Sequence, residues 1–121
     1  MKLVGVHHVS INISDVDAAL DFYVGKLGLV MRGDRPNLGY PGAWLNAGGQ
    51  QVHLIGAAVP NDQGQHFALQ VEDLGATIEE LRGGGVTVSD EIAIGTARQA
   101  FLHDPSGNLL ELHQAAAPVG A

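Results

Sequence analysis

The chain consists of two copies of one unit, because a shift of 58 positions lays residues 1–57 over residues 59–115. Each copy is too short to bury enough apolar surface to be stable alone, so we expect the copies to pack together. The shift superimposes four residues of metal-ligand type in two pairs, which are His8 with His66 and His53 with Glu111. A pseudo-two-fold axis between the copies would bring these four side chains toward one point.

We predict one domain over residues 1–121, built from these two modules. Module 1 covers about 4–57 and module 2 about 64–115, joined by a short linker that contains Pro60. The tail, 116–121, carries no pattern and is expected to fray.

The composition narrows the classes of partner. Asp and Glu number 13 against 6 Lys and Arg, and the basic residues are scattered along the chain. Nucleic acid is not expected as a partner, because phosphate binding needs a basic stripe. No apolar run suits a signal peptide or a membrane span, so we expect a cytoplasmic protein without a membrane partner. With no cysteine, any metal site has nitrogen and oxygen ligands.

Each half is predicted to fold as a strand, a helix and three strands. Residues 6–13 and 66–71 alternate between polar and apolar side chains, as a half-buried strand does. Helices are predicted at about 16–27 and from Asp73 to the glycines at 83–85, since an acidic cap opens each and glycine closes each. The other strands are predicted at about 29–34, 42–47 and 50–56, and at 86–92, 98–103 and 108–114.

The phase of these strands predicts where the ligand-type side chains point. His53 and Glu111 lie on the face of their strands that is opposite to the Val and Leu side chains, and His113 shares the face of Glu111. If the helices cover the Val and Leu side, the four ligand-type residues face away from the helices. Two sheets curled about the pseudo-axis would then form a cup lined by these residues.

Several strings of the sequence resemble the vicinal oxygen chelate superfamily, over about residues 4–115. They lie at 6–11 (VHHVSI), 21–23 (DFY), 27–29 (LGL), 66–69 (HFAL) and 101–112 (FLHDPSGNLLEL). This superfamily includes glyoxalase I, methylmalonyl-CoA epimerase, extradiol dioxygenases, fosfomycin-resistance enzymes and bleomycin-binding proteins. The resemblance implies an α+β fold, in which two tandem βαβββ modules form a cupped, mostly antiparallel eight-stranded sheet, or half-barrel, with the helices outside.

Carried over residue by residue, the resemblance implies one divalent metal ion (Ni, Zn, Mn or Fe(II)) bound by His8, His66 and Glu111. At the position of His53, glyoxalase I has a glutamate that binds metal and takes part in proton transfer, and the epimerases have a ligating glutamine. In extradiol dioxygenases the matching histidine stays off the metal and handles protons. His53 is therefore either a fourth ligand or a proton carrier, and His53 and Glu111 are the candidate catalytic residues.

Other residues are candidates for the wall of a substrate site, although aromatic residues on strands are more often core residues and lone arginines are more often solvated. His7 is predicted to face the apolar side, His103 to lie at a rim, and His113 to lie near the cup or on the surface. The substrate-binding candidates are Trp44, Tyr40, Phe101 and Arg98.

The resemblance implies a divalent-metal glyoxalase-like enzyme, a lyase or isomerase of the lactoylglutathione-lyase type, acting on a small oxygen-chelating carbonyl substrate. A metal ion with open positions eases proton transfer beside a carbonyl. An extradiol-type dioxygenase with Fe(II) is the alternative, because two imidazoles and a carboxylate form the facial triad of such enzymes. A third hypothesis is a non-catalytic, bleomycin-resistance-like drug-binding protein, which would lack the ligands. We expect a homodimer, with the modules paired within a chain or between chains.

Overall fold

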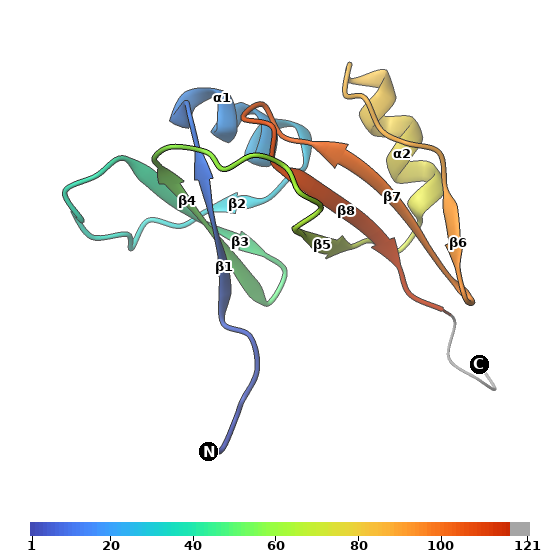
Figure 1. The fold of residues 1–121 in the computed structure, drawn as a ribbon, viewed down its shortest axis with the longest axis horizontal. Coiled ribbons are helices and arrows are strands. Elements are labelled where there is room, and N and C mark those ends of the chain that lie inside the picture. Colours follow the sequence, from blue (N-terminus) through green and yellow to red (C-terminus); the bar gives the residue numbers. More distant parts are fainter. Residues whose placement is uncertain (117–121) are drawn as a thin grey trace. The chain divides into compact units, whose positions relative to one another are not determined.

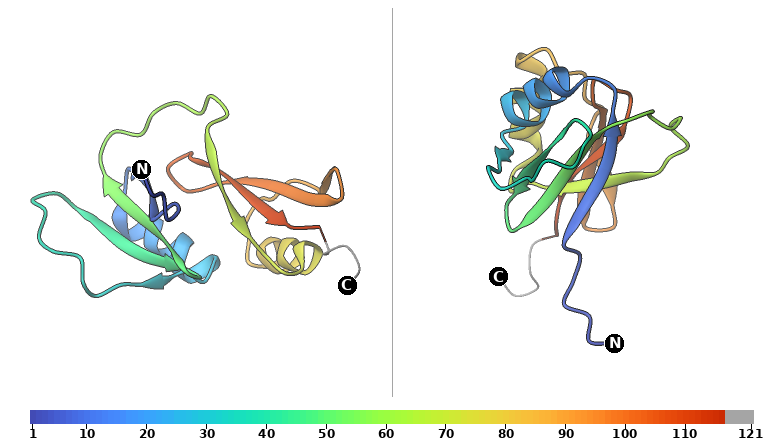
Figure 2. Two further views of the ribbon diagram at one scale, coloured as in Figure 1. Left: turned by 90° about the horizontal axis from the view of Figure 1, so that it is seen from below. Right: turned by 90° about the vertical axis from the view of Figure 1, so that its left-hand side faces the viewer.

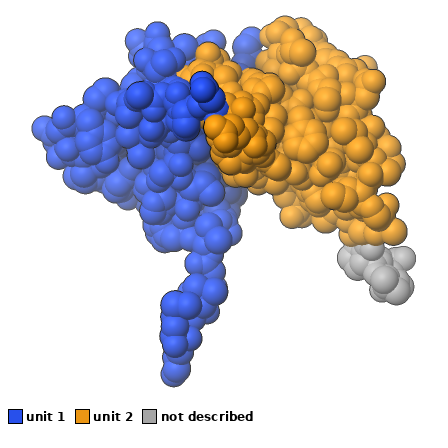
Figure 3. Space-filling view, in the orientation of Figure 1, with its two compact units in different colours: residues 1–61 blue, residues 62–121 orange. Residues whose placement is uncertain are grey.

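The computed structural model describes residues 1–116, and the chain divides into two compact units, Met1–Asn61 and Asp62–Ala121 (Figure 3). In each unit a strand is followed by helical structure and then by three strands. The predicted α+β class and the two βαβββ modules are therefore confirmed. The predicted fraying at 117–121 lies outside the described residues.

Unit 1 contains a four-stranded sheet in the order β1-β4-β3-β2 (Figure 1). Strand β1 runs parallel to β4, and the other two pairs are antiparallel. The strands are β1 (His8–Ile13), β2 (Val30–Met31), β3 (Gly42–Ala47) and β4 (Gln50–Gly56). The strand predicted at 29–34 is thus shorter, although one further bond joins the Arg32 N–H to the Trp44 carbonyl at 2.8 Å.

The helical segment of unit 1 changes its winding halfway. Helix α1 (Val16–Leu20) continues directly as a π-helix, η1 (Asp21–Lys26), so the predicted helix at 16–27 is correct in extent but not in type. The Leu27 N–H donates to the Phe22 carbonyl five residues back, at 2.9 Å. This wider turn accompanies the burial of two consecutive aromatic side chains, Phe22 and Tyr23.

Unit 2 repeats the arrangement with the sheet order β5-β8-β7-β6 and a parallel β5–β8 pair. Its elements are β5 (His66–Gln70), α2 (Leu74–Gly83), β6 (Ile92–Ile94), β7 (Ala97–His103) and β8 (Leu109–Gln114). The strand predicted at 86–92 is wrong in position. There the Arg82 guanidinium binds the Val88 carbonyl at 2.9 Å, the Ser89 N–H donates to the Phe101 carbonyl of β7, and regular pairing with β7 begins only at Ile92.

Equivalent aspartates begin the two helices. The carboxylate of Asp15 accepts from the Ala18 N–H, and that of Asp73 accepts from the Ala76 N–H, both at 3.0 Å. Each bond satisfies one of the N–H groups that the first helical turn leaves without a backbone partner. The predicted acidic caps are confirmed in both modules.

Each helix covers one face of the sheet in its own unit (Figure 2). On β4, Val52 and Leu54 are almost completely buried on this helix-facing side, and on β8 the same is true of Leu110 and Leu112. Side chains alternate along a strand, so the residues between them lie on the other face, which we call the open face of each sheet. In the described part of the chain no helix is long and apolar enough to cross a membrane.

Candidate functional site

A stack of three rings lies on the open face of unit 1. The imidazoles of His8 and His53 are nearly parallel, with centroids 3.9 Å apart. Trp44 stacks on His53 with centroids 4.5 Å apart, and the register of β3 and β4 places Trp44 directly opposite His53. Because β4 lies between β1 and β3, the ring of His53 is held from both neighbouring strands.

The surroundings of His53 favour its neutral form. Burial lowers its pKa, because its residue is only 8% exposed, and nearby groups that carry or can take up positive charge, first of all His8, lower the pKa further. Its Nε2 lies 2.9 Å from Oε1 of Gln51. Since an amide oxygen only accepts, the hydrogen sits on Nε2 and Nδ1 keeps a lone pair for a proton or a metal ion.

His7 does not face the apolar side, so that prediction is wrong. The residue precedes β1 and is exposed, and its Nδ1 lies 2.8 Å from Nδ1 of His8. Two imidazole nitrogens at this distance share one hydrogen. His7 therefore supports the orientation of His8 instead of packing in the core.

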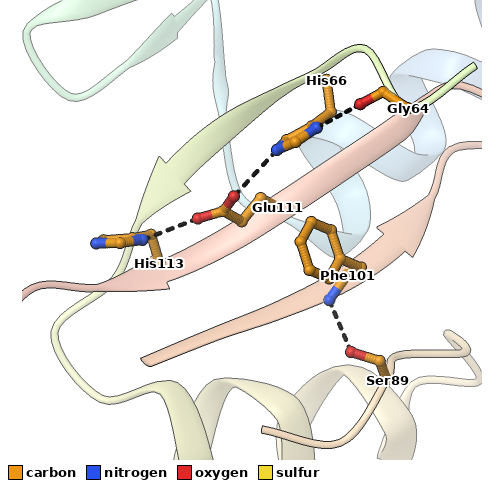
Figure 4. Close-up of polar contacts among 6 residues, drawn as sticks. All are labelled: Gly64, His66, Ser89, Phe101, Glu111 and His113. Atoms are coloured by element: carbon orange, nitrogen blue, oxygen red, sulfur yellow. Dashed lines mark hydrogen bonds and ion pairs between the residues drawn. The ribbon is translucent and has the colours of Figure 1, made fainter. Parts of the chain in front are cut away.

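A carboxylate with two imidazole partners lies on the open face of unit 2 (Figure 4). Nε2 of His66 is 3.0 Å from Oε1 of Glu111, and Nδ1 of His113 is 2.8 Å from Oε2. The residue Glu111 is only 9% exposed. The ring of Phe101, opposite Glu111 on β7, meets the ring of His66 edge to face at 5.4 Å.

The ring of His66 is oriented by the backbone. Its Nδ1 donates to the Gly64 carbonyl at 2.8 Å, which raises its pKa, and the hydrogen bond to Glu111 raises the pKa further. In this structure both ring nitrogens act as donors, so His66 is the cation of the pair. If a metal ion replaced the Nε2 hydrogen, the Nδ1 bond to the carbonyl would remain, and this bond is typical of metal-ligating histidines.

The four predicted ligand-type residues thus form one pair in each unit. His8 and His53 contact each other in unit 1, and His66 and Glu111 contact each other in unit 2. Within neither unit, over residues 1–116, do three His, Asp or Glu side chains group so as to hold a metal ion. Binding by all four residues stays a prediction.

The aromatic candidates differ in their surroundings. Trp44 and Phe101 lie opposite His53 and Glu111 in the strand registers, which makes them equivalent although they are 57 and not 58 positions apart. Tyr40 lies in the exposed loop before β3, where the guanidinium of Arg35 sits 5.4 Å from its ring centroid. The substrate contacts of all three stay predictions.

Arg98 lies on the other face of its sheet from Phe101. Its register partner on β8 is Gln114, whose side chain accepts from the Leu74 N–H at the start of α2. The Arg98 guanidinium pairs with Glu91 at 2.8 Å. The predicted contact with an anionic substrate gains no support from this position.

Two further histidines also have partners. Strand phase predicts that His113 shares the face of Glu111, but it does not predict the hydrogen bond to that carboxylate. The only signal in the sequence is the spacing of two residues along β8. His103, predicted at a rim, is exposed and its Nε2 lies 2.8 Å from Oδ2 of Asp62.

Comparisons with known proteins agree with the predicted resemblance. The family profile of the Glyoxalase/Bleomycin resistance protein/Dioxygenase superfamily matches residues 5–112. A protein of Synechocystis sp. named probable lactoylglutathione lyase is 31% identical, over 88% of this chain and 92% of that protein. A solved glyoxalase family protein from Bacillus anthracis has a TM-score of 0.87 at 23% identity, covering 94% and 97%. An antibiotic-binding protein from a Streptomyces species has a TM-score of 0.82 at 26% identity, covering 96% and 99%.

Proposed function

The chain belongs to the glyoxalase/bleomycin resistance protein/dioxygenase superfamily, and from this premise we propose that it is a divalent-metal-dependent lyase or isomerase of the lactoylglutathione-lyase type. The proposed substrate is a small carbonyl compound with adjacent oxygen atoms. One observation carries the proposal. The Gly64 carbonyl orients the ring of His66, and Nε2 of this ring lies 3.0 Å from Oε1 of Glu111. An imidazole held in this way is prepared to bind a metal ion through Nε2.

The donor set fits a borderline divalent ion. Imidazole nitrogen and carboxylate oxygen suit Ni, Zn, Mn or Fe(II). The chain has no cysteine, so no thiolate is present that would favour a softer metal ion. The proposed ligands are His8, His66 and Glu111, with His53 as a fourth ligand or a proton carrier. Each unit supplies one pair, so two units complete the set, from one chain or from two copies in a homodimer. When bound, the ion would act as a Lewis acid toward the substrate carbonyl.

The surroundings of His53 suit proton transfer. Burial and the neighbouring positive charges lower its pKa, so that the ring is neutral and accepts a proton at neutral pH. The Gln51 side chain holds Nε2, which leaves Nδ1 as the accepting atom. Stacking between His8 and Trp44 restricts rotation of the ring. We propose that His53 moves the proton next to the carbonyl group.

The alternative is an extradiol-type ring-cleaving dioxygenase that uses Fe(II). His53 favours it, because the resemblance to the extradiol dioxygenases places at this position a histidine that stays off the metal, and the bond to Gln51 leaves Nδ1 of His53 to accept a proton. The other donors are then two imidazoles and one carboxylate, which is the facial set of non-haem iron oxygenases.

Metal content and two activity assays test the proposal. The protein is purified without added metal, analysed for bound metal, and assayed with the hemithioacetal of methylglyoxal and glutathione and, separately, with catechols while oxygen uptake is followed. We expect nickel, zinc or manganese together with hemithioacetal turnover, and loss of both in Glu111→Gln but not in the control His103→Gln. Iron with oxygen consumption would favour the dioxygenase. Failure to bind any of the four metals would overturn the proposal and favour a drug-binding protein.

A further inference from the structure

We infer that His113 positions the Glu111 carboxylate so that Oε1 alone is presented to a metal ion, an inference that rests on the proposed function. Glu111 has two chemically identical oxygens, and the structure gives each of them a different imidazole partner (Figure 4). Oε1 faces Nε2 of His66, the nitrogen that would bind the metal. Oε2 faces Nδ1 of His113 at 2.8 Å.

The hydrogen-bond chemistry fixes the direction of this contact. An ionised carboxylate only accepts hydrogen bonds, so Nδ1 of His113 carries the hydrogen and donates it to Oε2. Bonds to a charged acceptor are stronger than neutral ones. The side chain of Glu111 is only 11% exposed, so little water is available to replace the donor.

This contact decides which of the two carboxylate oxygens of Glu111 lies beside His66. The last torsion of a glutamate side chain is broad and roughly two-fold, so a carboxylate without a fixed partner exchanges its oxygens freely. A donor on Oε2 stops this rotation and leaves Oε1 beside His66. The carboxylate is then prepared to bind a metal through one oxygen, without first losing rotational freedom.

The arrangement is found in one module only. By the repeat, the position of His113 corresponds to Ile55, and the strand registers agree, since Ile55 pairs with Asn12 and His113 with Gln70. Isoleucine has no donor, so the duplicated scaffold does not require one here. The donor accompanies the carboxylate of Glu111 and is absent beside the imidazole of His53.

The chain contains a matched control for an ordinary histidine–carboxylate pair. His103 and Asp62 also form a 2.8 Å contact in unit 2, with side chains 54% and 33% exposed. This pair does not involve Glu111. A substitution of His103 therefore shows how much the loss of a comparable histidine–carboxylate pair elsewhere in unit 2 changes zinc affinity.

Zinc affinity measured by competition with a chelator tests the inference, with the wild type, His113→Phe, His113→Asn and His103→Phe compared after their folding is checked by circular dichroism. We expect His113→Phe to bind zinc about 10–100-fold more weakly, the usual cost of removing an outer partner of a ligand. His113→Asn should bind like the wild type, because its amide N–H is as many bonds from the backbone as Nδ1–H. His103→Phe should bind unchanged.

Two outcomes separate the inference from the proposed function. If the wild type binds neither zinc nor any of the other three metals, the proposed function fails and the inference fails with it. If the wild type and His113→Phe bind equally well, or if Asn rescues no better than Phe, the inference alone is overturned. A readout without metal is the nitrogen-15 spectrum of the metal-free protein, in which His113 should carry its hydrogen on Nδ1. A hydrogen on Nε2 alone would contradict the contact with Oε2.

Discussion

The open faces of the two units use equivalent positions for different chemistry. The first and last strands present His8 and His53 in unit 1, and His66 and Glu111 in unit 2. In unit 1 the two rings stack with centroids 3.9 Å apart, whereas in unit 2 an imidazole and a carboxylate form a 3.0 Å hydrogen bond. The last strand carries an imidazole in unit 1 and a carboxylate in unit 2, and the two rings stack in the first case whereas an imidazole and a carboxylate are hydrogen-bonded in the second.

The difference extends to protonation. Burial and neighbouring positive charges lower the pKa of His53, whereas the Gly64 carbonyl and Glu111 raise the pKa of His66. Unit 1 therefore offers a neutral imidazole that accepts a proton, and unit 2 offers an anion that holds a cation. Each copy thus keeps the same packed face, while the open faces carry groups with opposite pKa shifts; under the proposed function, unit 1 supplies the proton carrier His53 and unit 2 supplies the metal ligands His66 and Glu111.

The largest expected effect is on metal binding. His66→Ala should abolish zinc binding measured by equilibrium dialysis, because it removes the imidazole that the backbone has already oriented. His53→Ala should keep most of the binding and lose proton transfer, because its ring is held by Gln51 and by stacking. His103→Ala serves as the control. Equal loss of metal in both variants would make His53 a fourth ligand and would remove the division of tasks between the units.

A second effect, on stability, should be the same in both units. Leu54 and Leu112 are equivalent in the repeat and almost completely buried. Leu54→Ala and Leu112→Ala should each lower the free energy of unfolding by about 2–5 kcal/mol, since a cavity replaces a packed side chain. Urea unfolding measures this, with the exposed Ile94→Ala as a control that changes stability by less than about 0.5 kcal/mol. Clearly unequal losses would show that the packed faces are not equivalent.

The smallest expected effect is the pH response of the metal-free protein. Proton NMR should give His53 a pKa below 6.5 and His66 a pKa above 6.5. With its pKa lowered, His53 makes stability fall as the pH drops below about 6.5. With its pKa raised, His66 contributes stability below about 6.5, which is lost as the pH rises through its folded-state pKa. Shifts in the same direction would contradict the comparison, and His53→Gln identifies the resonances.

Local patterns in the sequence predict much of this fold. The caps at Asp15 and Asp73 depend only on contacts within one helical turn, and the structure contains both. The alternation along β4 and β8 predicts correctly that His53 and Glu111 lie opposite the buried Val and Leu side chains. These features could be predicted because their periods, 3.6 and 2 residues, appear directly in the sequence.

Features that depend on turn length could not be predicted in this way. A two-residue turn at 48–49 joins β3 to β4, whereas five residues, 104–108, join β7 to β8. This difference makes Trp44 equivalent to Phe101, which lies 57 positions further on, so the 58-residue shift does not hold on the third strand. Asp104 stabilises the longer turn by accepting from the N–H groups of Ser106 and Asn108, each at 2.9 Å.

Contacts between particular side chains also could not be predicted from the sequence. Spacing places His113 on the face of Glu111 but does not say which carboxylate oxygen it binds. The π-helix is a similar case, because an α-helical pattern over 16–27 does not reveal that Phe22 and Tyr23 are both buried by a wider turn. In the same way, the sequence does not show that the Arg82 guanidinium binds the Val88 carbonyl in a stretch whose regular pairing with β7 begins only at Ile92.

The bond from His66 to the Gly64 carbonyl makes the start of unit 2 sensitive to insertion. Asp62 secures the same stretch through Oδ1, which accepts from the Gly64 N–H at 2.8 Å; the contact with His103 uses the other oxygen, Oδ2, so loss of His103 leaves this bond in place. Residues inserted between Asp62 and His66 would separate the Gly64 carbonyl from the imidazole, so the ring would lose its orientation. Residues inserted ahead of Asp62 would leave both contacts with Gly64 in place.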